Sequence, residues 1–236
     1  MKKSFSLIIF ILIFTFLFTM GTNMIKANAA ITYFSFVTTN PSEDTSTNMN
    51  ISWHSKFAGS KLEYTLVADK EFANAITIAP TEEEWSTQGQ ANADKNDGFY
   101  TPRYRCQTTL TGLTPRTRYM YRCVFNGNYS DVHYFTTSGL TNTWNFMAFV
   151  DFQNPNNKLS HSIINTLYSK ADYPSLAVCS GDLTGCGGYE ADWNWLLNNS
   201  AFNNFIFASA PGDHEYWATD SSPVTYFNTP YTFNGI

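Results

Sequence analysis

Basic residues are scarce in this 236-residue sequence, and their scarcity excludes one large class of partners. Lys and Arg number 14 against 19 Asp and Glu, and charged residues make up only 14% of the chain. Loss of the first 29 residues would remove Lys2, Lys3 and Lys26 but no acid, taking the formal net charge from −5 to about −8. Nucleic-acid binding needs a basic surface, so we expect no nucleic acid among the partners.

Several signatures of catalysis are also missing. Without a Gly-x-Ser-x-Gly motif, a serine hydrolase of the α/β type is not indicated. Without a Cys-x-x-Cys motif, neither a zinc knuckle nor a thioredoxin-type site is indicated. Two hypotheses remain for the cysteines: they pair in an oxidising compartment, with near neighbours suggested among three allowed connectivities, or all stay buried free thiols. The near-neighbour pairs are Cys106–Cys123 and Cys179–Cys186.

Residues 1–29 have the pattern of a secretory signal peptide. The basic start MKKSF precedes the apolar run SLIIFILIFTFLFTM, and Ala27 and Ala29 form a small-residue cleavage site. The apolar run is short for a membrane span of ~20 residues. We therefore expect cleavage close to Ala29, a secreted, extracellular product and no stable membrane span afterwards. An uncleaved anchor is the alternative.

Residues 31–138 have the rhythm of an all-β domain. Short runs such as NMNISWHS, KLEYTLVAD and RYMYRCVF alternate apolar and polar residues between turns. Tyr119 follows a corner formed by Leu113 and Pro115, which is the arrangement of a tyrosine corner. The polar segment 82–101 is expected to be a loop. The region resembles a fibronectin type III sandwich.

The rhythm changes after a Thr, Gly and Asn-rich connector at 136–145, and a second domain is predicted over 144–236. Three apolar runs, WNFMAFVD, SLAVCSGD and NFIFASAPGD, are expected to be buried strands, the first of them buried on both faces. Two segments with helical spacing separate them, the first stopping at Pro174. This βαβαβ order predicts a parallel sheet layered by helices.

Each of these strands ends in an acid: Asp151, Asp182 and Asp213. The intervals, 151 to 182 and 182 to 213, are both 31 residues, as two βα units of similar length would give. The acids are therefore expected at the carboxyl edge of one sheet, where ligands bind in open α/β folds. Three carboxylates there repel one another unless a cation joins them. The pattern predicts a metal site and disfavours a glycosidase acid pair.

The motifs VDFQ, SGDLTG and PGDHE, in this order, resemble the first three motifs of the calcineurin-like metallophosphoesterases. With the sandwich in front of them, they resemble bacterial relatives of the purple acid phosphatases. The resemblance implies a secreted phosphoesterase that hydrolyses phosphate esters with a metal-bound hydroxide. It implies two metal ions, Fe, Mn or Zn, with Asp151 on the first, Asp182 bridging both and Asp213 on the second. His214 would act on the phosphate or protonate the leaving oxygen, with Glu215 or a neighbour holding its ring.

Three positions depart from the family pattern. Gln153 stands where many members have a His ligand, so its amide oxygen is a candidate metal ligand, with a loop hydrogen bond as the alternative. Asp213 replaces the usual Asn, which keeps an oxygen but adds a charge. Gly185 stands where purple acid phosphatases have a metal-binding Tyr, so no purple colour is expected.

The later histidines of the family are missing, because only His214 of the four histidines lies in a motif. His54 and His133 are expected to be exposed or hydrogen-bonded strand residues, and His161 lies on the first predicted helix. We therefore expect a C-terminally truncated chain: an all-β fibronectin type III-like sandwich followed by an incomplete α/β metallophosphoesterase core, with weak metal binding and little turnover. The alternative is a secreted or surface binding module with a degenerate, inactive core.

Overall fold

The computed structural model describes most of the chain after the predicted signal peptide. The described residues are 33–85, 103–140, 144–152, 158–172, 174–187, 190–219 and 222–223. The predicted signal peptide and the candidate ligand Gln153 lie outside them. The chain from Tyr33 onward forms one compact unit, so the predicted division near 138–144 stays a prediction.

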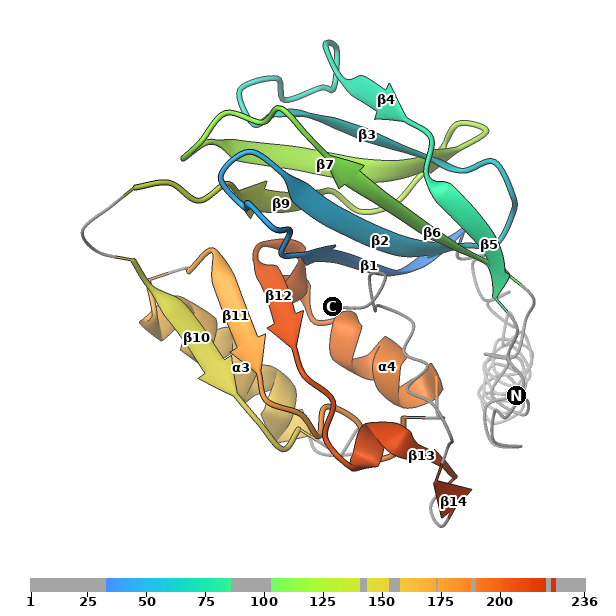
Figure 1. The fold of residues 1–236 in the computed structure, drawn as a ribbon, viewed down its shortest axis with the longest axis vertical. Helices are drawn as coiled ribbons and strands as arrows, with labels where there is room; N and C mark the ends of the chain where they lie inside the picture. The colour runs from blue at the N-terminus through green and yellow to red at the C-terminus, as the bar shows by residue number, and fades with distance from the viewer. Residues whose placement is uncertain are drawn as a thin grey trace, which may run out of the picture. The chain divides into compact units, whose positions relative to one another are not determined.

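Two antiparallel sheets form the first part of the structure (Figure 1). One sheet has the order β1-β2-β6-β5; the other has the order β4-β3-β7-β8, with β9 also paired to β7. The strands are β1 (Phe34–Asn40), β2 (Met49–Ser55), β3 (Lys61–Leu66), β4 (Ile76–Ile78), β5 (Thr81–Trp85), β6 (Arg103–Leu110), β7 (Arg118–Phe125), β8 (Asn128–Tyr129) and β9 (His133–Thr136). The prediction that this region is built from strands is therefore confirmed.

A shared apolar core lies between these two sheets. Ile51 and Trp53 of β2, Leu62 of β3 and Tyr121 of β7 are all fully buried in it. The Trp53 indole nitrogen donates a hydrogen bond to the Ser60 hydroxyl at 3.0 Å, so burial of the ring leaves no unpaired polar atom. The period-two alternation read from the sequence is the cause of this core, because alternate strand residues point to one face.

The predicted tyrosine corner is confirmed. The Tyr119 hydroxyl accepts a hydrogen bond from the Thr114 backbone N–H at 2.9 Å, and Leu113 at the same corner is buried. This bond connects strand β7 to the turn before it, as in other sandwiches with this corner.

The prediction of a loop over 82–101 is wrong for its first residues. Glu82 to Trp85 belong to the edge strand β5, which pairs with β6. Glu83 forms an ion pair with Arg105 of β6, and Glu82 accepts a hydrogen bond from the Gly59 N–H at 2.9 Å. Acidic side chains suit an edge strand, because they discourage pairing with another chain.

Both sandwich histidines are buried, so exposure, one of the two expected arrangements, is wrong, whereas the other, a hydrogen-bonded strand residue, is found at His54. His54 Nδ1 accepts a hydrogen bond from Arg103 Nε at 2.7 Å. His133 stacks on the Tyr121 ring at 5.2 Å between centroids. Among the described residues, its Nδ1 has no hydrogen-bond partner. Burial lowers the pKa of His133 from 6.5 to about 4.

Burial of neutral His133 makes stability depend on pH. Between pH 6.5 and about 4 the unfolded chain binds a proton that the folded chain does not, so stability falls as pH falls through this window. The pKa difference corresponds to about 3 kcal/mol by pH 4. Phenylalanine cannot bind the proton, so we expect His133→Phe to remove this part of the dependence of the unfolding free energy on pH. Urea unfolding at pH 7 and pH 4.5 measures it; an unchanged slope in the variant would contradict the assignment.

Three further strands form a parallel sheet in the order β10-β11-β12, shown side by side in Figure 1. Register pairs Met147 with Ala177 and Ala177 with Phe207. The remaining elements are β10 (Phe146–Phe149), α3 (Lys158–Lys170), β11 (Leu176–Cys179), α4 (Glu190–Leu197), η1 (Ser200–Asn203), β12 (Ile206–Ser209), η2 (His214–Tyr216), β13 (Trp217–Thr219) and β14 (Ser222–Pro223). The described helices all lack the length and apolar content needed to cross a membrane.

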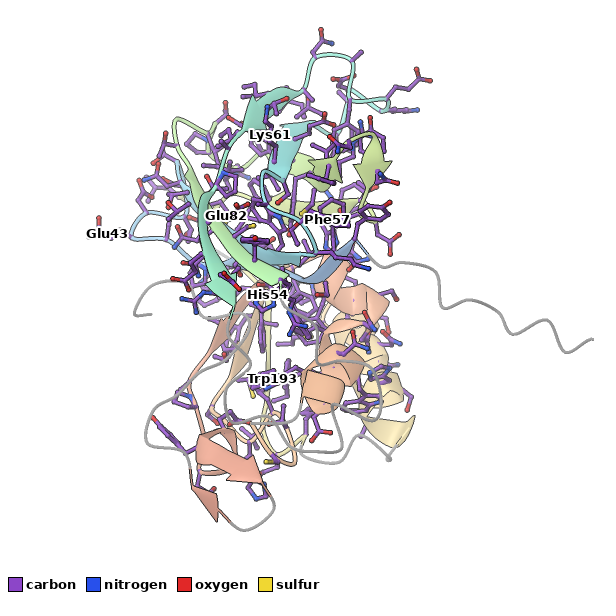
Figure 2. The ribbon with its side chains drawn as sticks, turned by 90° about the vertical axis from the view of Figure 1, so that its right-hand side faces the viewer. Glu43, His54, Phe57, Lys61, Glu82 and Trp193 are labelled. Atoms are coloured by element: carbon purple, nitrogen blue, oxygen red, sulfur yellow. The ribbon has the colours of Figure 1, made fainter. Side chains whose placement is uncertain are left out.

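One face of the parallel sheet carries the helices. Ile164 of α3 and Trp193 of α4 (Figure 2) share one buried cluster with Met147 and Phe149 of β10. The expectation that β10 is buried on both faces is wrong, because its residues alternate and Phe146 is 48% exposed. Both described α-helices pack on the Met147 side. On the opposite side Phe146 is exposed, whereas Ile206, in register with it across β11, is buried against the sandwich.

The sandwich and the helix-bearing sheet each place a residue in the apolar core of the other. Phe36 of β1 belongs to the cluster of the parallel sheet, and Ile206 of β12 belongs to the cluster of the sandwich. The Asn40 side chain donates a hydrogen bond to the Phe207 carbonyl at 3.1 Å in a buried position. Strand β1 is therefore packed into both parts of the fold.

All four cysteines are buried free thiols. Of the two hypotheses from the sequence, the structure has the unpaired one. Burial raises the pKa of Cys106 to about 12, so this thiol stays protonated and unreactive in the folded chain.

Candidate metal-binding site

The three acids follow the carboxyl ends of the parallel strands. Asp151 comes two residues after β10, Asp182 three after β11 and Asp213 four after β12. The first two loops are joined by the backbone, because Phe152 N–H donates to the Asp182 carbonyl at 2.8 Å. Parallel strands end at one edge of a sheet, which brings these loops together.

Glycines allow the second and third loops to touch. A Cβ atom on Gly212 would lie 1.9 Å from Asp182 Oδ1 and 2.5 Å from the Asp182 backbone nitrogen. A Cβ atom on Gly181, whose φ is +119°, would lie 2.5 Å from the Gly212 nitrogen. Any side chain at these positions would push the two loops apart, so the glycines set how closely the aspartates approach.

Two of the aspartates adopt a left-handed backbone. Asp151 has φ +57° and Asp182 has φ +54°. Asp tolerates this region better than other side chains, because its short polar group bonds locally. Conformations of this kind are concentrated at functional sites, where the surrounding structure holds them in place.

A group of three possible ligands lies at this edge. Ligand atoms of Asp182, Asp213 and His214 all lie within 4.8 Å of one another. Asp213 is exposed, while Asp182 and His214 are half-buried. Asp151 is exposed and is not one of this group, and Gln153 lies outside the described residues. Two carboxylates and an imidazole are a donor set that suits Mn, Fe or Zn.

The His214 ring is held by a backbone carbonyl. Its Nδ1 lies 2.8 Å from the Gly185 oxygen, which can only accept, so Nδ1 carries the proton and Nε2 is the basic nitrogen. The His214 backbone N–H donates to Asp182 Oδ1 at 3.3 Å. Of the holders that the resemblance implied, Glu215 or a neighbour, the structure does not have Glu215; the Gly185 carbonyl holds the ring.

Glu215 binds the backbone of the two neighbouring loops. It is only 2% exposed. Its Oε2 accepts from the N–H groups of Asp182 and Gly212, both at 2.8 Å. Its Oε1 accepts from the Leu183 N–H at 2.8 Å and from the N–H and hydroxyl of Thr184 at 3.0 and 3.1 Å. The motif PGDHE marks this acid in the sequence, but nothing in the motif shows that its partners are amides.

Helix α4 holds the far end of the second loop. Asp192 Oδ2 accepts from the N–H groups of Gly185 and Cys186 at 3.0 and 3.3 Å. The Trp193 indole donates to the Gly187 carbonyl at 2.9 Å. The sequence pattern does not indicate these two contacts, because a helical Asp that binds a loop has the same pattern as a helical Asp in solvent.

The Cys179 thiol lies close enough to the acids for their charges to affect its pKa. Burial, with added repulsion from the carboxylates of Glu215, Asp151 and Asp182, raises its pKa to about 12. The sulfur donates to the Gly181 carbonyl at 3.5 Å. A thiol that stays protonated is a poor nucleophile.

Comparison with known proteins finds a family similarity for the first part of the chain. Residues 35–137 match the family model of the purple acid phosphatase N-terminal domain. This match covers the strands from β1 to β9, and it confirms the resemblance to purple acid phosphatases indicated by the sequence.

Solved structures give a likeness of fold. The purple acid phosphatase PPD1 from yellow lupin (Lupinus luteus) seeds superposes with a TM-score of 0.63 at 17% identity, over 80% of this chain and 38% of that one. The structure of PhoD aligns with a TM-score of 0.46 at 12% identity, over 77% of this chain and 39% of that one. This chain thus spans about two-fifths of the length of the lupin phosphatase. None of the curated proteins compared with it matches significantly.

Proposed function

We propose that this protein is an exported, metal-dependent phosphoesterase of the purple acid phosphatase type. One observation carries the proposal: Asp182, Asp213 and His214 converge within 4.8 Å at the carboxyl edge of a parallel sheet. The purple acid phosphatase match of residues 35–137 supports it. Export would use the predicted signal peptide, and the substrate would be a phosphate ester.

The side chains divide the work by their chemistry. Asp182 and Asp213 would hold a cation with carboxylate oxygens, and Asp151 would serve a second one. Cations held there supply positive charge to the phosphate oxygens and activate water toward the ester. His214, protonated at Nδ1 toward Gly185, has Nε2 as the atom that takes up a proton and passes it to the leaving oxygen.

Metal titration tests the proposal directly. We expect the chain to bind Mn²⁺ in isothermal titration calorimetry, and Asp182→Ala to lower the affinity by roughly 100-fold or more, since even residues that only orient ligands contribute 10–100-fold. Asp131→Ala is the matched control, because it removes the same charge from an exposed position of the sandwich. Equal affinities in all three proteins would refute the site.

Substitution of His214 distinguishes between two roles for this residue, action on the phosphate and metal ligation. If it acts on the phosphate, His214→Gln will keep Mn²⁺ affinity and lower the rate of p-nitrophenyl phosphate hydrolysis, with 10²–10⁴-fold as the usual range for a proton-transfer group. If it is a third ligand, affinity will fall as well.

One observation favours the alternative of a binding module with an inactive core. Exposed Asp151 is outside the three-residue group, so the described residues bring together donors for one cation rather than two. Absence of both Mn²⁺ binding and hydrolysis would establish that alternative.

A further inference from the structure

Within the described residues, all hydrogen-bond donors to the Glu215 carboxylate are uncharged. Four backbone N–H groups and one hydroxyl donate to its oxygens at 2.8 to 3.1 Å. A carboxylate removed from water is costly unless its oxygens are hydrogen-bonded, and bonds to a charged acceptor are stronger than neutral ones. The five donors therefore compensate for the burial of this acid and fix its position.

A single oxygen of this side chain joins the two ligand-bearing loops. Oε2 accepts from the Asp182 N–H after β11 and from the Gly212 N–H after β12, each at 2.8 Å. Asp182 is itself a candidate ligand, and Gly212 precedes the other, Asp213. Because the oxygen fixes both amides, it sets the separation of the two backbones that carry the aspartates.

The same residue determines the place of His214, its neighbour in η2. The His214 carbonyl accepts from the Gly187 N–H at 2.9 Å, and a Cβ atom on Gly187 would lie 2.1 Å from the Glu215 oxygen of the backbone. Helix η2 is thus packed against the second loop, and the Glu215 side chain reaches back to that loop's first residues.

From these contacts we infer that Glu215 is the positioning residue of the site, holding Asp182, Asp213 and His214 in the geometry that binds a cation. It acts through amides and not on substrate or metal, since its oxygens are already bound and it is buried. The inference rests on the proposed function, whose site it completes.

The substitution Glu215→Gln tests this with almost no change of shape. An amide side chain keeps one oxygen and turns the other acceptor into an N–H₂ donor. The new N–H₂ group would then face donors on one of two sides. These are either the N–H groups of Asp182 and Gly212 or the three donors of Leu183 and Thr184. The two loops should separate, and we expect Mn²⁺ affinity to fall about 10–100-fold, as for residues that orient ligands.

A matched control separates positioning from plain loss of stability. Tyr119→Phe deletes a partly buried hydrogen bond of the sandwich and touches none of the ligand-bearing loops, so it should leave Mn²⁺ affinity unchanged. A second, milder variant is Thr184→Val, which removes only the hydroxyl bond to Oε1; we expect a decrease of a few-fold. This variant keeps the test open if Glu215→Gln does not fold.

Amide hydrogen exchange without metal provides an independent readout. In the wild type, the amides of Asp182, Leu183, Thr184 and Gly212 should be protected, and in Glu215→Gln they should exchange much faster while those of β12 do not. Lost protection with wild-type Mn²⁺ affinity would overturn the inference and leave the proposed function standing. Lost protection in a protein whose wild type binds no Mn²⁺ would overturn the proposed function and, with it, the role inferred for Glu215. Unchanged protection would overturn the inference in either case.

Discussion

Replacing Gly212 with alanine is expected to remove Mn²⁺ binding. The added Cβ would lie 1.9 Å from Asp182 Oδ1 and 2.5 Å from its backbone nitrogen, which is far inside contact distance. The loops must then separate, displacing a ligand oxygen and breaking the Gly212 N–H bond to Glu215. We expect roughly a 100-fold or greater loss of affinity, and a stability loss of about 1–3 kcal/mol, as for other overpacked positions.

Gly112→Ala is the control for this change. Gly112 has φ +68° and open space around its Cβ position, so alanine there costs about 1–2 kcal/mol of backbone strain without touching the site. Its Mn²⁺ affinity in calorimetry should equal that of the wild type. Wild-type affinity in Gly212→Ala would show that contact between the loops is not required for the site.

The second large effect is expected from Trp193→Ala in helix α4. Trp193 is fully buried, so its removal should cost about 3–5 kcal/mol. Phe36 of the sandwich packs in the core of the parallel sheet, and Ile206 of the sheet packs in the core of the sandwich. We therefore expect the whole compact unit to unfold in one cooperative transition, whose midpoint temperature Trp193→Ala lowers. Scanning calorimetry and far-UV circular dichroism should then give coincident transitions.

Trp195→Ala on the same helix is the matched control. Trp195 is only partly buried and stacks on His161 at 4.5 Å, so its loss should cost less than that of Trp193. Two separate transitions, with only the second lowered by Trp193→Ala, would mean that the sandwich and the helix-bearing sheet unfold independently.

The sequence predicted those elements whose pattern depends on local periodicity. Alternation around Ile51 and Trp53 predicted β2, and the corner at Tyr119 predicted a specific hydrogen bond that the structure contains. The positions of Asp182 and Asp213 after strands could also be predicted, because a strand-helix-strand repeat fixes which edge the loops share.

Features that depend on which neighbour covers a face could not be predicted in this way. The apolar run containing Phe146 indicated burial on both faces, but only its alternate residues are covered by the described helices. His54 was expected to be exposed or hydrogen-bonded, but no local pattern indicated that its partner would be Arg103, 49 residues away in sequence. Three of the four backbone amide partners of Glu215 likewise come from a loop more than 30 residues earlier.

The position of strand β1 in both cores has a consequence for the time course of folding during synthesis. The Asn40 side chain bonds to the Phe207 carbonyl, and the two residues are 167 apart in sequence. At synthesis rates of about 5–20 residues per second, this partner emerges roughly 8–33 s after Asn40. During that interval Phe36 has no complete core to enter, so the early strands are exposed to other chains. Protection by a chaperone would matter most in this period.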